Sequence, residues 1–321
     1  MPALPQGLYP AATVKAIDAA AIAAGTPGVV LMKRAARAAL NLILAHYPNA
    51  PLWIVCGGGN NGGDGYVLAG LAQSRGLQVT LFWEQDPAGL RNEASAAYAF
   101  AQQEQVVMQP VAALPEQAPE HLLIVDALLG IGLKGDVRPA TAALITQLNH
   151  YRAARLALDI PSGLCADTGR VLGVALQADH TLCFVALKPG LLTGRGPALV
   201  GELLFDDLAL APEFYPPPPI TRVDAHTCAG LLPRRAADAH KGHSGHVLVV
   251  GGELGMGGAG LFLGDLGRLG VAGVTKVADS GSRVITSQQS SGAISCFRSY
   301  LKLNSPGMTL SAQRFACCQW L

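Results

Sequence analysis

The chain has 321 residues, which is enough for one large domain or two smaller ones. Half of the residues are hydrophobic, 14% are charged and the formal net charge is +1, so we expect a large core and no nucleic-acid-binding surface. We see no secretory signal or membrane-spanning stretch, and the seven cysteines include no C-x-x-C pair, which argues against structural zinc and favours a reducing, cytoplasmic environment.

Apolar residues at helical spacing predict helix over residues 13–46, with a break at residues 25–28. The expected strands are 52–56, 77–83, 122–126, 155–159, 180–186 and 202–206, and the expected helices between them are 66–74, 94–103 and 140–148. Strands that alternate with helices predict a mainly parallel sheet covered on both faces, which is a three-layer, Rossmann-like α/β fold. Ligands of such sheets bind outside the carboxyl ends of the strands.

The most distinctive segment, Gly57–Gly65, lies between the first expected strand and its helix and reads Gly-Gly-Gly-Asn-Asn-Gly-Gly-Asp-Gly. A strand, a glycine-rich turn and a helix together present backbone N–H groups to a phosphate. Asn60, Asn61 and Asp64 add oxygens that form hydrogen bonds or bind cations. The segment is not a P-loop, because no Lys-Ser or Lys-Thr follows it. A purely structural turn is the alternative.

Polar residues also end other expected strands. Asp126 precedes a second glycine-rich loop, 128–136, and two such loops side by side fit a dinucleotide pyrophosphate. Asp159 precedes Ile160-Pro161-Ser162-Gly163, and either aspartate could instead cap the turn that follows it. Lys188 follows the strand that ends near residue 186, so it faces either solvent or an anionic ligand on the same rim.

We expect the side chains of Asn61, Asp126 and Ser162 to bring neutral and charged oxygens to one place on this rim. Hard cations prefer oxygen ligands, and one carboxylate with an amide and a hydroxyl suits a loosely held ion such as potassium. A hydrogen-bonded polar cluster without an ion is the alternative.

Four prolines at residues 216–219 end this unit and predict a semi-rigid spacer. We therefore divide the chain into a first domain (1–215), a linker (216–235) and the start of a second α/β domain (236–277). That start contains an expected strand, 246–250, between the glycine-containing motifs 241–245 and 251–260. Residues 278–321 have no clear periodicity, and we expect a poorly ordered tail.

Four motifs, in this order along the chain, resemble the NAD(P)H-hydrate epimerase family. They are residues 59–65, 125–132, 158–163 and 187–190, and the resemblance extends from Leu8 to Pro212. Lys33 and Ala36 stand where the family usually has Glu and Gly. Residues 238–260 resemble the start of the ribokinase-like, ADP- or ATP-dependent NAD(P)H-hydrate dehydratase. The later Gly-Thr-Gly-Asp motif of that family has no counterpart, so we expect a truncated or frame-shifted dehydratase half without activity.

The resemblance implies that the protein interconverts the R and S forms of hydrated NADH and NADPH, in the repair of nicotinamide cofactors. This chemistry needs a general acid–base pair near the ring, which the resemblance places at Asp159 with Lys188 assisting or orienting it. The implied substrate contacts are Asn60, Asn61, Gly62, Gly63, Asp64, Gly130, Ile131, Gly132, Leu133, Lys134, Gly135, Asp136 and Asp159. The implied potassium ligands are Asn61, Asp126 and Ser162, and ADP or ATP is implied only for a complete dehydratase half.

Three other functions fit the sequence less well. The first is a bifunctional epimerase and dehydratase, and the second is a non-catalytic nucleotide-binding or interaction module. The third is a hydride-transferring dehydrogenase, which is disfavoured because the acidic residue expected after the second strand is not clearly placed, Glu84 being the nearest. We expect no nucleic-acid or membrane partner, and the apolar composition leaves room for a homodimer.

Overall fold

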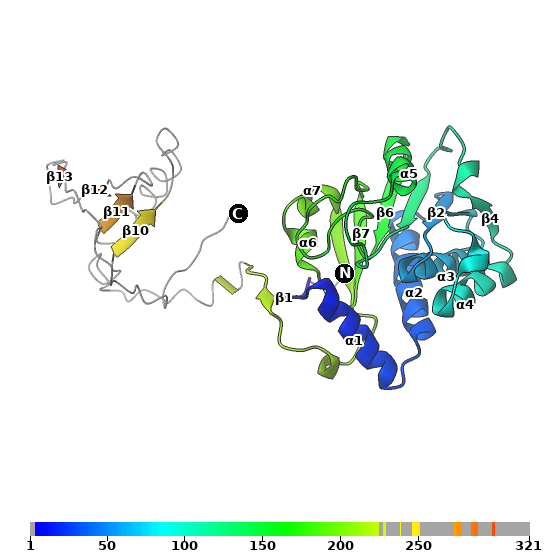
Figure 1. Ribbon diagram of the computed structural model, residues 1–321, viewed down its shortest axis with the longest axis horizontal. Coiled ribbons are helices and arrows are strands. Elements are labelled where there is room, and N and C mark those ends of the chain that lie inside the picture. The colour runs from blue at the N-terminus through cyan, green and yellow to red at the C-terminus, as the bar shows by residue number, and fades with distance from the viewer. Residues whose placement is uncertain are drawn as a thin grey trace. The chain divides into compact units, whose positions relative to one another are not determined.

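The computed structural model describes residues 4–224, 227, 228 and 238, together with the backbone of four strands beyond them. The chain divides into two compact units, Met1–Cys228 and Ala229–Leu321, which we describe separately. The first unit is built on a seven-stranded sheet in the order β4-β3-β2-β5-β6-β7-β8, and all its neighbouring strands run parallel (Figure 1). The expected Rossmann-like α/β fold is therefore confirmed for this unit.

The sheet consists of β2 (Leu52–Cys56), β3 (Val79–Trp83), β4 (Val107–Pro110), β5 (Leu123–Ala127), β6 (Ala154–Leu158), β7 (His180–Phe184) and β8 (Glu202–Asp206). The chain runs outward from β2 to β4, returns to β5 on the other side of β2, and then continues to β8. The strand order thus reverses between β2 and β5, where sheets of this kind form a ligand-binding crevice. All residues of β2 and β5 are buried, which explains their unbroken apolar sequences.

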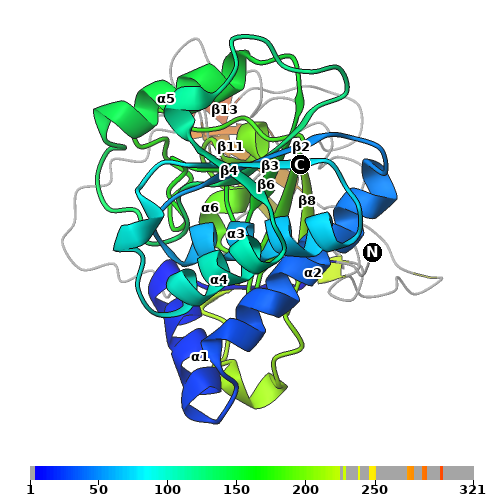
Figure 2. The ribbon, with the colours of Figure 1, turned by 90° about the vertical axis from the view of Figure 1, so that its right-hand side faces the viewer.

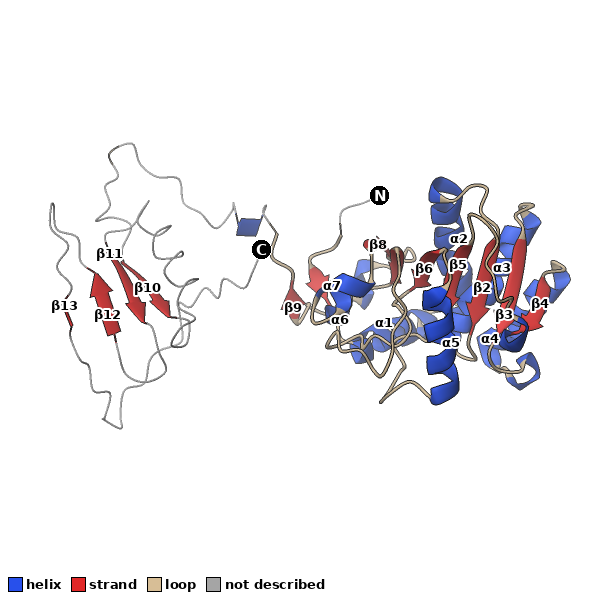
Figure 3. Cartoon of the chain, turned by 90° about the horizontal axis from the view of Figure 1, so that it is seen from above, coloured by secondary structure: helices blue, strands red, loops and turns tan. Residues whose placement is uncertain are grey.

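Helices cover both faces of the sheet. They are α1 (Ala11–Ala23), α2 (Gly28–His46), α3 (Asn60–Ser74), α4 (Asn92–Gln103), α5 (Pro139–His150), α6 (Pro189–Leu192) and α7 (Gly196–Leu199), with short 3-10 helices η1 (Pro87–Gly89), η2 (Val111–Ala113) and η3 (Pro212–Phe214). Figure 2 shows α2, α3 and α4 on one side of the strands and α5 on the other, and Figure 3 shows the strands of the sheet side by side. Separate apolar cores fill the two sides.

Two features differ from the expectations. Helix α3 begins at Asn60 and not near Tyr66, so most of the segment expected as a turn forms the first turns of a helix. Strand β4 was not expected, because it is a short edge strand whose residues are mostly accessible and lack a clear alternation.

A small second sheet ties the two ends of the first unit together. Strand β1 (Gly7–Leu8) pairs antiparallel with β9 (Ile220–Thr221). Leu8 also forms an isolated parallel bridge with Leu187, beside Lys188. Residues 220–221 of the expected linker therefore belong to a sheet of the first unit.

The described part of the second unit is a four-stranded sheet of β10 (His246–Val250), β11 (Gly273–Val277), β12 (Val284–Ser287) and β13 (Phe297–Arg298). The first pair is parallel and the other two are antiparallel. The motifs at residues 241–245 and 251–260 lie outside the described residues, as does most of the expected tail, so the ribokinase-like segment stays a prediction.

Within the residues that the structure describes, no single helix has both the length and the apolar character to cross a membrane. Only α1 and α2 taken together pass that test, and they are bent by 119° where they meet.

Candidate active site

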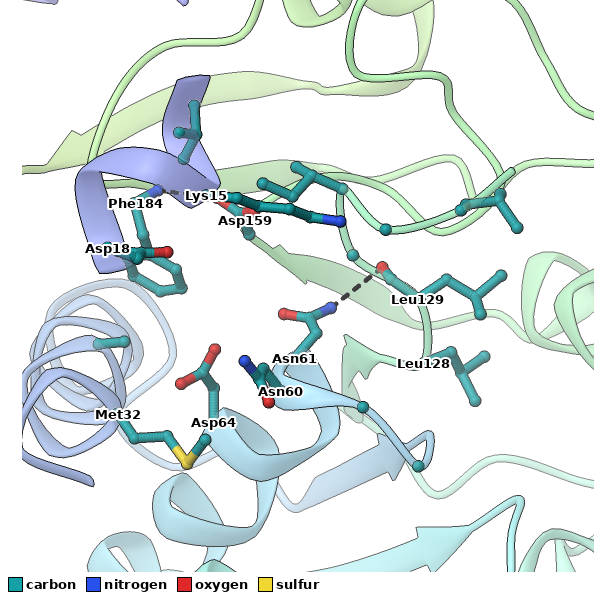
Figure 4. A pocket seen from close by; sticks show the side chains of 18 of the residues that line it. Lys15, Asp18, Met32, Asn60, Asn61, Asp64, Leu128, Leu129, Asp159 and Phe184 are labelled. Atoms are coloured by element: carbon teal, nitrogen blue, oxygen red, sulfur yellow. Dashed lines mark hydrogen bonds between the residues drawn. The ribbon is translucent and has the colours of Figure 1, made fainter. Parts of the chain in front are cut away.

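A cavity of about 770 Å³ opens at the carboxyl ends of the strands in the first unit. Its lining comes from the segments that follow β2, β3, β5, β6 and β7, and α1 and α2 supply a further wall. The volume lies in the range of pockets that hold small molecules and cofactors. Figure 4 shows side chains from α1, α3 and the loops after β5 and β6 pointing into this space.

Most of the predicted site residues meet at this cavity. Its lining includes Asn60, Asn61, Asp64, Gly130, Ile131, Gly132, Leu133, Lys134, Asp136, Asp159 and Lys188. Five others lie away from the lining, namely Gly62, Gly63, Asp126, Gly135 and Ser162. The sheet therefore brings together strand ends that are far apart in the sequence, as expected for a parallel α/β fold.

The glycines around α3 permit close packing. A Cβ atom on Gly62 would lie 1.9 Å from the carbonyl oxygen of Gly57, and a Cβ atom on Gly57 would lie 2.0 Å from that of Leu128. A Cβ atom on Gly65 would lie 2.6 Å from Cys56 Sγ. Gly59, at the N-cap of α3, instead has open space around the position of a Cβ atom, and it lines the cavity.

A buried ion pair lies at one end of the cavity. Lys188 Nζ donates a short hydrogen bond to Asp159 Oδ1 and another, of 2.8 Å, to the carbonyl oxygen of Phe184. The Lys188 side chain is 0% exposed and that of Asp159 is 15% exposed, so the alternative of a surface lysine is wrong. Burial alone lowers the pKa of Lys188, but Asp159 and Cys183 beside it outweigh this effect and raise the pKa above its usual value.

The backbone around this pair is unusual. Asp159 has a φ of +65°, in the left-handed region that Asp and Asn tolerate better than most residues. Its Oδ1 atom accepts a hydrogen bond of 3.1 Å from the backbone N–H of Phe184. Val185, just after β7, has a φ of +63°, and the chain turns there to reach Lys188 at the start of α6. These contacts fix the carboxyl group of Asp159 at the edge of the cavity.

Two further carboxyl groups face the same space. Asp18 reaches the cavity from α1 and Asp64 from α3, and Figure 4 shows both near Asp159. Burial, with a smaller contribution from Asp159, raises the pKa of Asp18 to about 6. Burial, together with Asp159 and Asp18, raises the pKa of Asp64 well above its usual value.

Sequence reasoning predicted Asp64 but missed Asp18. The signal for Asp18 is its place on a helical face, because Val14, Asp18 and Ile22 are spaced by four residues and all line the cavity. Several other lining residues were also unassigned in the sequence, namely Lys15, Glu84, Gln85, Arg138 and Thr141.

The predicted potassium ligands lie around the backbone of Leu129, at the end of β5. The carboxylate of Asp126 accepts hydrogen bonds from Ser162 Oγ at 2.6 Å, Ser162 N at 2.8 Å and Leu128 N at 3.1 Å. Ser162 Oγ accepts a bond of 2.9 Å from Leu129 N, and Asn61 Nδ2 donates one of 3.1 Å to Leu129 O. These hydrogen bonds join the start of α3, the loop after β5 and the turn after β6 into one cluster.

This cluster has the features of a site for a hard cation. Asn61 Oδ1 is buried and has no hydrogen-bond partner among the described residues. Burial, opposed by the hydrogen bonds from Ser162 and Leu128, raises the pKa of Asp126 to about 6. A cation would satisfy the unpartnered amide oxygen and stabilise the carboxylate. The side chains of the cluster are an amide, a carboxylate and a hydroxyl, and such oxygens suit a hard cation better than they suit a transition metal.

Comparison with known proteins gives consistent similarities. Residues 28–190 match the family model described as YjeF-related protein N-terminus. The chain is 41% identical over 257 residues to the bifunctional NAD(P)H-hydrate repair enzyme Nnr of Coxiella burnetii, covering 78% of this chain and 52% of that protein. It is 40% identical over 250 residues to the enzyme of the same name from Escherichia coli, covering 77% and 48%. The chain thus spans about half the length of these curated relatives.

A shorter relative is covered over most of its length. The chain is 39% identical over 184 residues to the NAD(P)H-hydrate epimerase of Limosilactobacillus fermentum, which corresponds to 57% of this chain and 87% of that protein. The crystal structure of the yeast protein ynu0 aligns with a TM-score of 0.52 and 18% identity over 57% of this chain and 82% of the yeast chain. At that identity the structural match supports the fold alone.

Proposed function

This chain belongs to the family of YjeF-related protein N-termini, and from this premise we propose that its first unit is an NAD(P)H-hydrate epimerase. It would interconvert the R and S forms of hydrated NADH and NADPH. The observation that carries the proposal is the Asp159–Lys188 pair, which presents a fixed carboxyl group to a cavity of cofactor size. The relative named NAD(P)H-hydrate epimerase, covered over 87% of its length, supports it.

A dinucleotide bound in the cavity would lie across the reversal of strand order. The backbone at Gly58 and Gly59 lies at the start of α3, and the loop 130–134 lies opposite it after β5, so phosphates fit between them. Lys15, Lys134 and Arg138 also line the cavity and supply positive charge. This arrangement leaves the end beside Asp159 for the hydrated nicotinamide ring.

The reaction inverts a single ring carbon, and its proton transfers take place at the oxygen bound to that carbon. An acid donates a proton to the ring hydroxyl, the C–O bond breaks, and water leaves while the ring nitrogen's electron pair forms an iminium-like cation. Water then adds to this planar cation from the other face and gives a proton to a base. Asp159 can hold or accept that proton, because Lys188 and the N–H of Phe184 fix the orientation of its carboxyl group.

We also propose that Asn61, Asp126 and Ser162 hold a potassium ion. The buried oxygen of Asn61 that lacks a partner supports this assignment. When bound, the ion would supply a positive charge beside the loops that contact the substrate. The residues themselves join the start of α3 to the loops after β5 and β6.

The direct test is epimerisation of purified hydrated NADH, followed by NMR or chiral chromatography. Asp159→Asn suits the left-handed backbone at this position better than Ala, and we expect it to lower the rate by about 10²- to 10⁴-fold. The single variant leaves Lys188 buried without a carboxylate, so Asp159→Asn with Lys188→Met serves as the folding control. A rate like that of the wild-type protein in the Asp159→Asn variant would contradict the assignment.

The names of the longer relatives favour a second activity, dehydration of the hydrated cofactor. The test is ADP- or ATP-dependent loss of hydrated NADH in the presence of this 321-residue chain. Binding of hydrated NADH without any turnover would instead support a non-catalytic module.

We also propose a cytoplasmic location, because the four cysteines described in the structure, Cys56, Cys165, Cys183 and Cys228, are free thiols.

A further inference from the structure

We propose that Asp18 is a second acid–base group, which acts on the face of the nicotinamide ring opposite to the face served by Asp159. The proposal rests on the epimerase function proposed above and adds a catalytic residue to it. It concerns a position outside residues 28–190, the segment matched by the family model.

The chemistry requires two groups. The hydroxyl must leave from one face of the ring, and in the productive direction water must return to the other face. A single carboxyl group on one face returns the hydroxyl to the face that it left, which exchanges the oxygen atom but does not change the configuration. Epimerisation therefore needs one group that donates the proton on the first face and another that accepts a proton on the second face.

The structure supplies two carboxyl groups from separate elements. Asp159 stands at the end of β6, whereas Asp18 projects from the middle of α1, and both line the cavity. Figure 4 shows the carboxyl group of Asp18 and that of Asp159 facing one space. Val14 and Ile22, one turn before and one turn after Asp18, line the cavity with it, so this face of α1 forms a wall beside the ring.

The environments of the two groups differ in the way that an acid and a base require. Lys188 forms its ion pair with Asp159, and neither of the two ion pairs among the described residues includes Asp18. Burial and the charge of Asp159 raise the pKa of Asp18 to about 6 against the opposing charge of Lys188, so Asp18 holds a proton near neutral pH more often than an ordinary aspartate does. Pairs of carboxyl groups with such different surroundings commonly divide the acid and base roles in enzymes.

Other charged or titratable groups surround Asp18, and they do not replace it. Lys15 lies on the same helix, and Asp64, Asp159 and Lys188 line the cavity with it. Tyr215, after η3, has a raised pKa, mainly through burial and in part through Asp207 and Asp18. Asp64 lies in the first turns of α3, beside Asn60 and Asn61, where it is suited to contact the rest of the substrate.

The test separates loss of the hydroxyl from inversion by means of H₂¹⁸O. Each pure epimer of hydrated NADH is incubated with the full chain in H₂¹⁸O, the epimers are separated by chromatography, and their ¹⁸O content is measured by mass spectrometry. We expect Asp18→Asn to reduce interconversion by about 10²-fold or more, while one epimer still exchanges its hydroxyl oxygen and the other does not. Asp159→Asn should show the opposite preference.

Glu213→Gln is the matched control, because Glu213 is an exposed carboxylate in η3 and does not line the cavity. We expect it to exchange and interconvert both epimers as the wild-type protein does. Interconversion at the wild-type rate in Asp18→Asn overturns the proposal, and so does an equal loss of exchange from both epimers in a variant that still unfolds cooperatively. If the wild-type protein itself does not interconvert the epimers, the epimerase function fails and not only the role of Asp18.

Discussion

A carboxyl group that is held in a poorly solvated place carries a cost in stability at neutral pH. Asp18 and Asp64 both show this effect, since burial is the largest cause of their raised pKa values. Lys188 does not, because its partner Asp159 offsets the burial of its charge. We therefore expect removal of Asp18 or Asp64 to change the stability of the fold differently from removal of Asp159 or Lys188.

We expect Asp18→Asn to stabilise the protein at pH 7.5 and to have little effect at pH 4. The folded-state pKa of Asp18 is about 6, above the ordinary value of 3.8, so the stability that the protonated carboxyl contributes is full below pH 3.8 and is lost as the pH rises through about 6. Two pKa units correspond to at most about 3 kcal/mol, and partial exposure of the side chain reduces this to about 1–2 kcal/mol. Urea unfolding of both proteins at the two pH values measures the difference.

A stabilisation of equal size at both pH values would contradict this account, since it would point to better packing and not to a raised pKa.

The sequence was informative about single residues wherever the fold class alone determines their position. Asp159 and Lys188 could be predicted because residues at the carboxyl ends of parallel strands meet at one edge of the sheet. Asp18 could not, because its access to the cavity depends on how α1 docks against the sheet, and the bend of 119° between α1 and α2 is a property of the tertiary structure.

Helix α3 shows how an element with poor intrinsic helix propensity is stabilised by its surroundings. Gly62, Gly63, Gly65 and Gly70 lie within it, although glycine costs about 1 kcal/mol relative to alanine inside a helix. Their low propensity led the sequence reasoning to expect a turn over residues 57–65. The structure requires them because neighbouring backbone and side chains lie where their Cβ atoms would be.

We therefore expect Gly62→Ala to destabilise the first unit despite the higher helix propensity of alanine. Its Cβ atom would lie 1.9 Å from the carbonyl oxygen of Gly57, so the start of α3 would have to move, at a cost of about 2 kcal/mol or more. Gly59→Ser is the matched control, because its Cβ atom meets open space and serine is favoured at an N-cap. Thermal unfolding compares the two variants, and equal melting temperatures would contradict the packing argument.

The loops around the cavity are joined at the cluster of Asn61, Asp126 and Ser162, and we expect potassium to stabilise this cluster. Raising potassium from zero to about a hundred times its dissociation constant, with choline as the replacement cation, should increase the free energy of unfolding by up to about 2.7 kcal/mol. Asn61→Ala removes the buried oxygen that lacks a partner and should abolish the increase. Asn60→Ala, next to it in α3, should retain it.

Equal responses of the Asn60 and Asn61 variants to potassium would show that the ion acts elsewhere. Because the measurement is of stability, this result would not depend on whether the protein is an epimerase.

On the scale of the whole molecule, contacts between the N-terminal residues and residues after the seven-stranded sheet hold the two ends of the first unit together. β1 pairs with β9, and the backbone N–H of Tyr9 donates to Leu187 O at 2.8 Å, next to Lys188. Tyr9 Oη also donates to Pro216 O at 3.0 Å. The four prolines in the sequence indicated a spacer. The pairing of β1 with β9 could not be predicted, because strands of two residues are too short to show an alternating pattern and these two are more than 200 residues apart.

These contacts predict that a fragment of residues 1–228 is more stable than a fragment of residues 1–215. Both contain the seven-stranded sheet, but the shorter one loses β9, the Tyr9–Pro216 bond and the bond of 2.8 Å from Arg222 to Leu4 O. At about 0.5–1.5 kcal/mol for each hydrogen bond, we expect a loss of about 2–4 kcal/mol. Because β1 leads directly into α1, hydrogen exchange should increase most over residues 7–23, and epimerisation should slow as Asp18 loses its fixed position. Equal stability and equal exchange in the two fragments would show that the unit ends before the proline run and that α1 is held by its own packing alone.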